Sequence, residues 1–174
     1  MEGTFYRYAK LKEITRESLT TKGRWVEIVQ VVKRFGLCGG MEEYVFQLSK
    51  ELNNMGLSIK VLCENQIDVT DERIEVIQLG KSPEKPRWYS HILFDRKTQN
   101  WVRQNKNEDL IVHSHERISC HNVTTIHSTL FNFPRKGFPT FRKYVNERLE
   151  RRELTSQCIR KIVPVSDVIG DQIK

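Results

Sequence analysis

Apolar residues along the chain gather in short runs that alternate with longer amphipathic segments. The first run, from Val26 to Val32, is nearly continuous and rich in β-branched residues, which is typical of a strand buried on both faces. Comparable runs predict further strands over residues 57–64, 74–80, 109–115, 122–128 and 161–166. This pattern favours a sheet whose strands are covered on both sides.

The segments between these strands carry the period of amphipathic helices. Gly56 is well placed to end a helix whose apolar face consists of Tyr44, Val45, Leu48 and Leu52. Further helices are predicted over residues 87–106 and 139–158. A last helix follows Ser166, whose hydroxyl can cap its first turn.

Strands that alternate with helices predict a parallel sheet, and right-handed crossovers place helices on both of its faces. The expected fold is therefore a doubly wound, Rossmann-like α/β domain over residues 25–174. Residues 1–24 are polar and show no clear period, so we interpret them as a lead-in. A chain of 174 residues is long enough for one such domain with a core of its own.

Composition indicates a soluble protein of a reducing compartment. The chain is 38% apolar and 29% charged, and no apolar run approaches the roughly 20 residues needed to cross a bilayer. No two cysteines form a C-x-x-C pair, and the four are Cys38, Cys63, Cys120 and Cys158. Free thiols fit this spacing better than a disulfide framework does, which predicts a cytoplasmic location.

The charge of the chain predicts an anionic partner. The formal net charge is +7, which suits phosphates, anionic lipid or nucleic acid without choosing among them. The charge is also unevenly distributed, because residues 135–152 contain seven basic residues and two acidic ones.

The loop Lys33 to Gly40 lies where an α/β fold binds anions, after a strand and before a helix. Gly39 and Gly40 would let the backbone approach a phosphate, or they would only form a tight turn. The loop is neither a G-x-x-x-x-G-K-[ST] loop nor a G-x-G-x-x-G turn. Glu64 ends the second strand as the ribose-binding acid of a nicotinamide or methyl-donor enzyme does, although a solvated strand end gives the same pattern.

Four of the five histidines lie within 15 residues of one another. His113, His115 and Glu116 end the fourth strand, and two-residue spacing puts the two histidines on one face. His121 and His127 flank the fifth strand. A metal could use these histidines with Cys120, but no known ligand spacing matches, and histidines at strand ends also contact ligands directly.

The stretch "FNFPRKGFPTFRKY" interleaves aromatic and basic residues from Phe131 to Tyr144. This mixture suits a lipid headgroup layer, single-stranded nucleic acid, or a core covered by a basic solvated helix. The residues that we assign to a membrane or acceptor patch are Phe131, Phe133, Arg135, Lys136, Phe138, Arg142 and Lys143.

Four stretches, taken in order, resemble the N-terminal domain of family 4 glycosyltransferases of the GT-B fold. They are "GGMEEYVFQLSKELNNMGLSIKVLCE", "DLIVHSHE", "VTTIHST" and "IVPVSDVIGDQI", and the resemblance covers about residues 27–174. Leu57 and Ser58 depart from the pattern, since the family often has histidine there. The "HE" pair and "ERRELTSQCIRKIVPVS" resemble enzymes that build lipopolysaccharide cores.

This resemblance implies a role for each matching residue. Gly39 and Gly40 would approach the diphosphate of a sugar nucleotide, and His127 would act as the catalytic residue beside the donor sugar. The residues that would line the acceptor cleft are His113, His115, Glu116 and His121. Such enzymes are retaining hexosyltransferases that generally need no metal and no cofactor besides the sugar-nucleotide co-substrate.

The resemblance also implies partners. The acceptor would be a membrane lipid or glycan, met at the anionic cytoplasmic face of a membrane, and no nucleic acid is expected. A second Rossmann-like domain with an E-x7-E motif would hold most of the sugar nucleotide. The chain ends before such a domain, so we expect it to contain the acceptor half and to be inactive alone. The alternative is a non-enzymatic Rossmann-like module that binds nucleotides or nucleic acid.

Overall fold

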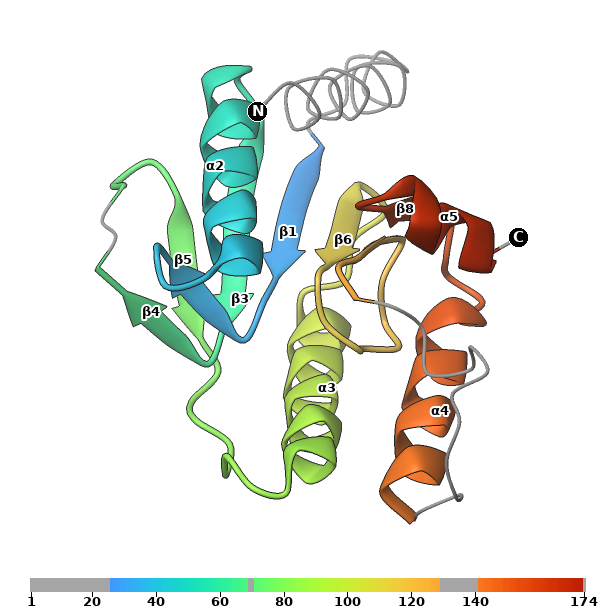
Figure 1. Ribbon diagram of the computed structural model, residues 1–174. Coiled ribbons are helices and arrows are strands. Elements are labelled where there is room, and N and C mark those ends of the chain that lie inside the picture. The colour runs from blue at the N-terminus through green and yellow to red at the C-terminus, as the bar shows by residue number, and fades with distance from the viewer. Residues whose placement is uncertain (1–25, 69–70, 129–140, 174) are drawn as a thin grey trace.

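A computed structural model describes residues 26–68, 71–128 and 141–173 of the chain. Its centre is a six-stranded sheet in the order β5-β3-β1-β6-β7-β8, and all of its strand pairs are parallel. The strands are β1 (Glu27–Val31), β3 (Ser58–Cys63), β5 (Glu75–Gln78), β6 (Leu110–Ser114), β7 (Val123–Ile126) and β8 (Lys161–Pro164). β1 lies inside the sheet, with β3 and β5 added on one side of it and β6, β7 and β8 on the other (Figure 1), which confirms the predicted doubly wound, Rossmann-like fold.

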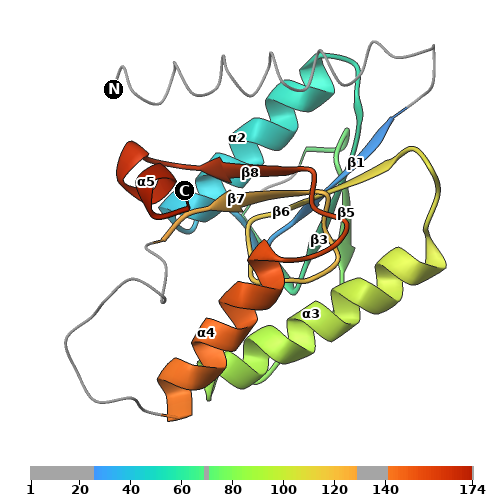
Figure 2. The ribbon, with the colours of Figure 1, turned by 90° about the vertical axis from the view of Figure 1, so that its right-hand side faces the viewer.

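Helices cover both faces of this sheet. They are α2 (Gly40–Asn54), α3 (Arg87–Gln104), α4 (Phe141–Leu154) and the short α5 (Asp167–Ile173). Figure 2 shows α3 and α4 together on one face and α2 on the other. Each of these helices begins at the carboxyl-terminal edge of the sheet because each follows a parallel strand.

Alternate residues of the central strand β1 supply two separate cores. Ile28 of β1 and Val32, which directly follows the strand, face α2, where they pack with Val45, Leu48 and Leu52. On the opposite face, the apolar residues gathered beneath α3 are Val29, Val31, Leu62, Phe94, Val112 and Ile118. Burial on both faces explains why this strand reads as a continuous β-branched run.

The loop after β1 corrects one sequence expectation. Residues 34–36 form a short strand, β2 (Arg34–Gly36), which pairs with β4 (Asn65–Ile67) in a separate two-stranded sheet. Gly36 has φ +146°, and a Cβ there would lie 1.9 Å from the carbonyl oxygen of Ile67, so only glycine fits. The sequence did not predict this pair because three residues are too few to show a period.

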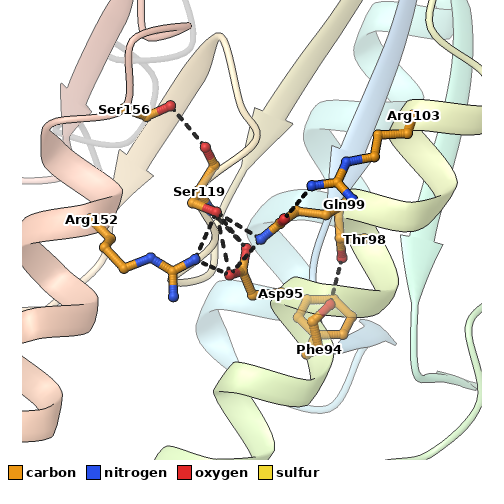
Figure 3. A network of polar contacts seen from close by, with 8 residues as sticks. All are labelled: Phe94, Asp95, Thr98, Gln99, Arg103, Ser119, Arg152 and Ser156. Atoms are coloured by element: carbon orange, nitrogen blue, oxygen red, sulfur yellow. Dashed lines mark hydrogen bonds and ion pairs between the residues drawn. The ribbon is translucent and has the colours of Figure 1, made fainter.

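A polar network joins α3, α4 and the segment between β6 and β7 (Figure 3). Asp95 of α3 is 2% exposed, and its carboxylate accepts hydrogen bonds from the Ser119 backbone amide at 2.8 Å and Arg152 of α4 at 2.7 Å. Gln99 also donates to Asp95 at 2.9 Å, and Ser156 donates to the carbonyl of Ser119 at 2.8 Å. The second half of α4 is thus attached to the domain by polar contacts.

Helix lengths differ slightly from expectation. α4 ends at Leu154, four residues before the predicted end at 158, and Thr155 continues only as a turn that donates to the Arg151 carbonyl. None of the helices in the described ranges is long and apolar enough to span a bilayer.

Candidate functional site

A cavity of about 300 Å³ opens at the carboxyl-terminal edge of the sheet, where ligands bind in open α/β folds. It extends from the start of α2 across the ends of β6 and β7 to α3 and α4. Its walls are formed by Met41, Arg87, Trp88, His91, His115, Glu116, Arg117, Thr125, Ile126, His127, Ser128, Arg142, Asn146, Glu150 and Glu153.

Two histidines at neighbouring strand ends are joined in a hydrogen-bonded relay. His115 Nε2 lies 2.8 Å from Gln30 Oε1, and His115 Nδ1 lies 3.0 Å from His127 Nε2. Because the Gln30 oxygen accepts, the proton of a neutral His115 is on Nε2, so Nδ1 accepts the proton of His127 Nε2. His127 Nδ1 is then left as a hydrogen-bond acceptor on a residue of the cavity wall.

Burial keeps these imidazoles neutral. It lowers the pKa of His127 to about 4, an effect that the carboxylate of Glu42 partly opposes. Burial also lowers the pKa of His115 well below its ordinary value, with His113 and His127 adding to the shift. The ring of Tyr44 packs edge-on against His127 and His115, with centroids 5.3 Å and 5.8 Å away. At neutral pH the relay can therefore bind hydroxyl groups without adding positive charge to the cavity.

Glu116 lies in the wall beside α3, with 11% of its side chain exposed. Its Oε1 accepts a 3.4 Å hydrogen bond from the Lys33 amide, and its Oε2 lies 3.7 Å from His91 Nδ1. Burial raises the pKa of Glu116 to about 7 and lowers that of His91 to about 3. The histidine is therefore neutral, and 3.7 Å is too long for a direct hydrogen bond. Both side chains are available to a ligand hydroxyl.

The wall formed by α4 is polar, although it is buried. Asn146, Glu150 and Glu153 are each at most 6% exposed. Glu153 accepts a 3.0 Å hydrogen bond from Thr124, and burial raises its pKa to about 8. Arg117 donates to Asn146 at 3.4 Å and also faces the carboxylates of Glu153 and Glu150. Buried carboxyl groups of this kind are expensive to maintain and are frequent at binding sites.

The glycine turn lies beside the cavity rather than in its wall. Gly39 has an extended backbone (φ 175°), and Gly40 has open space where a Cβ would be. Glu42 lies against Gly39, with Oε2 2.6 Å from the position of an added Cβ, and it is paired with Arg34 at 2.5 Å. The start of α2 is therefore open to a ligand, but it already carries a carboxylate of its own.

Other predicted site residues lie elsewhere. His113 is buried behind His115 with its Nε2 2.8 Å from Thr125 Oγ1, so it supports the wall instead of lining it. His121 precedes β7, is 1% exposed and takes no part in the wall, because the chain has returned toward the amino-terminal edge there. Arg142 does line the cavity, whereas Lys143 is 3.7 Å from Glu147 on the side of α4. Phe131, Phe133, Arg135, Lys136 and Phe138 lie outside the described residues.

Two alternative readings of the sequence receive no support from the geometry. Glu64 is not a solvated strand end: it is 8% exposed, with Lys33 Nζ at 3.5 Å and Lys97 Nζ at 3.9 Å. Cys120 packs in the core beneath α3, on the opposite side of the sheet from the His113 and His115 rings. Across the described ranges, no three His, Cys, Asp or Glu side chains are arranged to hold a metal ion.

Several wall residues were missed at the sequence level. Their common feature is a polar side chain on a helix, and they are Arg87, His91, Asn146, Glu150 and Glu153. The weak apolar character of α4 was a usable signal, because a helix packed on a sheet normally buries an apolar stripe.

Comparison with solved structures shows which known proteins share this fold. Eleven chains of solved structures match the fold. One is WaaG, a glycosyltransferase involved in lipopolysaccharide biosynthesis, with a TM-score of 0.65 and 12% identity. That match covers 77% of this chain and 37% of WaaG, so the chain spans little more than a third of that protein's length. No curated protein matched the sequence.

The family comparison is more specific than the structural one. The model of Glycosyltransferase Family 4 matches residues 38–174, which begin at the glycine turn and include both strand ends of the histidine relay. The fold resembles one half of a GT-B enzyme, as the sequence motifs predicted. The chain belongs to Glycosyltransferase Family 4.

Proposed function

We propose that this chain is the acceptor-binding domain of a retaining glycosyltransferase that transfers a sugar from a sugar nucleotide to a lipid-linked or lipopolysaccharide acceptor. The family match over residues 38–174 carries this proposal. The cavity supports it, because hydrogen-bonding side chains from two strand ends and two helices line one space at the carboxyl-terminal edge of the sheet, as a hydroxyl-rich acceptor would require. The acceptor class follows the likeness to WaaG.

His127 would lie nearest the transferred sugar in this scheme. Its neutral ring presents Nδ1 as an acceptor for a hydroxyl of the donor sugar or the acceptor, and His115 and Gln30 hold that tautomer. Gly40 would leave backbone room for the diphosphate, and a second Rossmann-like domain would supply most of the sugar-nucleotide contacts. The contribution of this chain would be positioning and fixed hydrogen bonds more than proton transfer.

The test is transfer of label from a panel of UDP- and GDP-sugars into lipid and lipopolysaccharide extracts by the longest product of this gene. His127→Ala should lower the rate about 100-fold, as expected for loss of one preorganised group at the reaction centre. His121→Asn is the matched control, since His121 is also buried but is not part of the wall. Absence of transfer with every sugar nucleotide would rule out the enzyme assignment.

A retaining reaction can be tested separately. The anomeric proton coupling of the product, read by NMR before mutarotation, should match that of the donor sugar. The opposite configuration would exclude the retaining mechanism and leave the transferase assignment intact.

Exposed aromatic residues beside basic ones on α4 support a membrane-associated location at the cytoplasmic face. Phe141 is 71% exposed and Tyr144 is 61% exposed, and Arg142 and Lys143 lie between them. The chain should cosediment with phosphatidylglycerol vesicles and much less with phosphatidylcholine vesicles. Charge reversal at Arg142 and Lys143 should abolish this difference. Equal binding of the variant would contradict the membrane proposal.

A further inference from the structure

The cavity mouth brings together the first turns of two helices that are far apart in the sequence. Trp88 in the first turn of α3 and Phe141 in the first turn of α4 contact each other edge to face, with ring centroids 5.9 Å apart. The neighbouring residues Arg87 and Arg142 both line the cavity and are both exposed. Two arginines from different helices therefore line the same cavity.

The two helix starts reinforce this positive charge. Neither helix, over its described residues, has an acid in its first turn, and α3 begins after Pro86 with no side-chain cap. The first N–H groups of a helix lack intrahelical partners, and the helix dipole gives this end a partial positive charge. By contrast, α2 carries Glu42 and Glu43 in its first turn. The mouth between α3 and α4 thus differs from the glycine turn as a place for an anion.

One buried nitrogen of the cavity wall lacks a hydrogen-bond partner among the described residues. His91 is 6% exposed, lines the cavity, and its Nδ1 has no hydrogen bond within the described part of the chain. A ligand hydroxyl between His91 Nδ1 and Glu116 Oε2, which are 3.7 Å apart, would satisfy both atoms. A buried nitrogen without a hydrogen-bond partner is energetically unfavourable, so its presence in a cavity wall indicates a polar ligand.

The negative charge of the carboxyl groups in the wall does not neutralise the positive charge of the arginines. Glu116, Glu150 and Glu153 line the cavity together with Arg87, Arg117 and Arg142. Because burial raises the pKa of Glu116 to about 7 and that of Glu153 to about 8, much of this negative charge is absent at neutral pH. A cavity of this composition is positive when empty and suits an anionic ligand.

We propose that the cavity binds a phosphorylated monosaccharide unit of the acceptor, with the phosphate between Arg87 and Arg142 and a sugar hydroxyl between His91 and Glu116. Arginine is well suited to phosphate because its planar donors bind two oxygens at once. Trp88 provides an apolar ring at the same mouth, against which a sugar face can pack. This inference rests on the proposed function and adds the chemical class of the acceptor.

The experiment titrates the 174-residue chain with glucose 1-phosphate, glucose 6-phosphate, glucose and inorganic phosphate at one ionic strength, followed by calorimetry and NMR. We expect at least one hexose phosphate to bind tenfold or more tightly than glucose or inorganic phosphate and to shift the ring signals of His91. Inorganic phosphate binding as tightly as the hexose phosphates would overturn the sugar part. Glucose binding as tightly as the hexose phosphates would overturn the proposed phosphate contact with the arginines. Failure of every compound to bind would overturn the whole site.

Variants locate the site. Arg87→Gln and Arg142→Gln should each weaken hexose phosphate binding about tenfold, whereas Lys143→Gln, a loss of the same charge beside the cavity, should not. His91→Leu should weaken the hexose phosphate and leave inorganic phosphate unchanged. If that variant does not fold, the affinity of Arg87→Gln for hexose phosphate still tests the site, because Arg87 is exposed and its substitution should not affect folding.

The binding and transfer experiments can fail independently. Hexose phosphate binding without any sugar transfer by the longest gene product would sustain the site and overturn the enzyme assignment. Transfer to unphosphorylated acceptors alone, without hexose phosphate binding, would support the enzyme assignment and overturn the proposed phosphate site.

Discussion

Helices α2 and α4 both follow a strand and both begin at the carboxyl-terminal edge, yet they bury different chemistry. α2 buries four apolar residues, Val45, Phe46, Leu48 and Leu52, together with Glu42 and Ser49. The residues that α4 buries are Asn146, Leu149, Glu150 and Glu153. The first helix stabilises the domain through apolar burial, whereas the second uses burial to enclose a polar cavity at the expense of stability. Such a contrast within one sheet separates the part that holds the fold from the part that serves a ligand.

The largest expected effect concerns the apolar helix. Leu48 is 4% exposed in the core beneath α2, so Leu48→Ala should lower the free energy of unfolding by about 2–5 kcal/mol. Tyr144 on α4 is 61% exposed, so Tyr144→Ala should change it by less than about 0.5 kcal/mol. Urea denaturation measures both. Similar losses for the two variants would remove the contrast between the helices.

Next in size is the polar attachment of α4. Asp95→Ala removes the acceptor for Arg152 and for the Ser119 amide, and it should cost about 1–3 kcal/mol. Hydrogen exchange should accelerate for the amides of α4 and stay unchanged in α2. Arg96→Ala, an exposed change one residue further along α3, is the control. Equal acceleration in both helices would show that Asp95 supports the whole domain rather than α4.

Glu153 allows the cost of the polar wall to be measured. Burial raises the pKa of Glu153 in the folded protein to about 8, above its pKa in the unfolded chain. Between these two pKa values only the unfolded chain is ionised at this position, so the protein loses stability as the pH rises through this range. Glu153→Gln keeps an acceptor for Thr124 and cannot ionise, so it should be more stable than the parent by about 1–2 kcal/mol at pH 8. The difference should shrink toward pH 5. A variant that is less stable at pH 8 would show that the carboxylate is stabilising.

The smallest effect concerns the relay, which lies between the two helices. The folded pKa of His127 is about 4, below its unfolded value, so the unfolded chain binds an extra proton between these values. Stability is therefore lost as pH falls below about 6.5, and His127→Gln should reduce this loss by about 1 kcal/mol per pH unit. Denaturation at pH 6.5 and 5.5 measures it. An unchanged slope would mean that His127 is solvated rather than buried.

Local pattern was sufficient to predict much of this molecule. The β-branched run of the first strand, the periodic face of α2 and the two-residue spacing of His113 and His115 each depend on contacts between near neighbours in sequence. The His113 and His115 rings do lie together, 4.3 Å apart. The pairing of β2 with β4 escaped prediction because it depends on one close backbone approach, at Gly36.

By itself, the sequence determined the order of strands and helices along the chain, the burial of the first strand on both faces and the family motifs at the strand ends. Only the tertiary structure decided which polar residues share the cavity. His91 is separated from Glu116 by 25 positions and from Glu153 by 62, and nothing in their local patterns links them. They meet because helices that follow parallel strands all begin at the same edge of the sheet. At that edge, burial rather than sequence spacing determines the charge of these side chains.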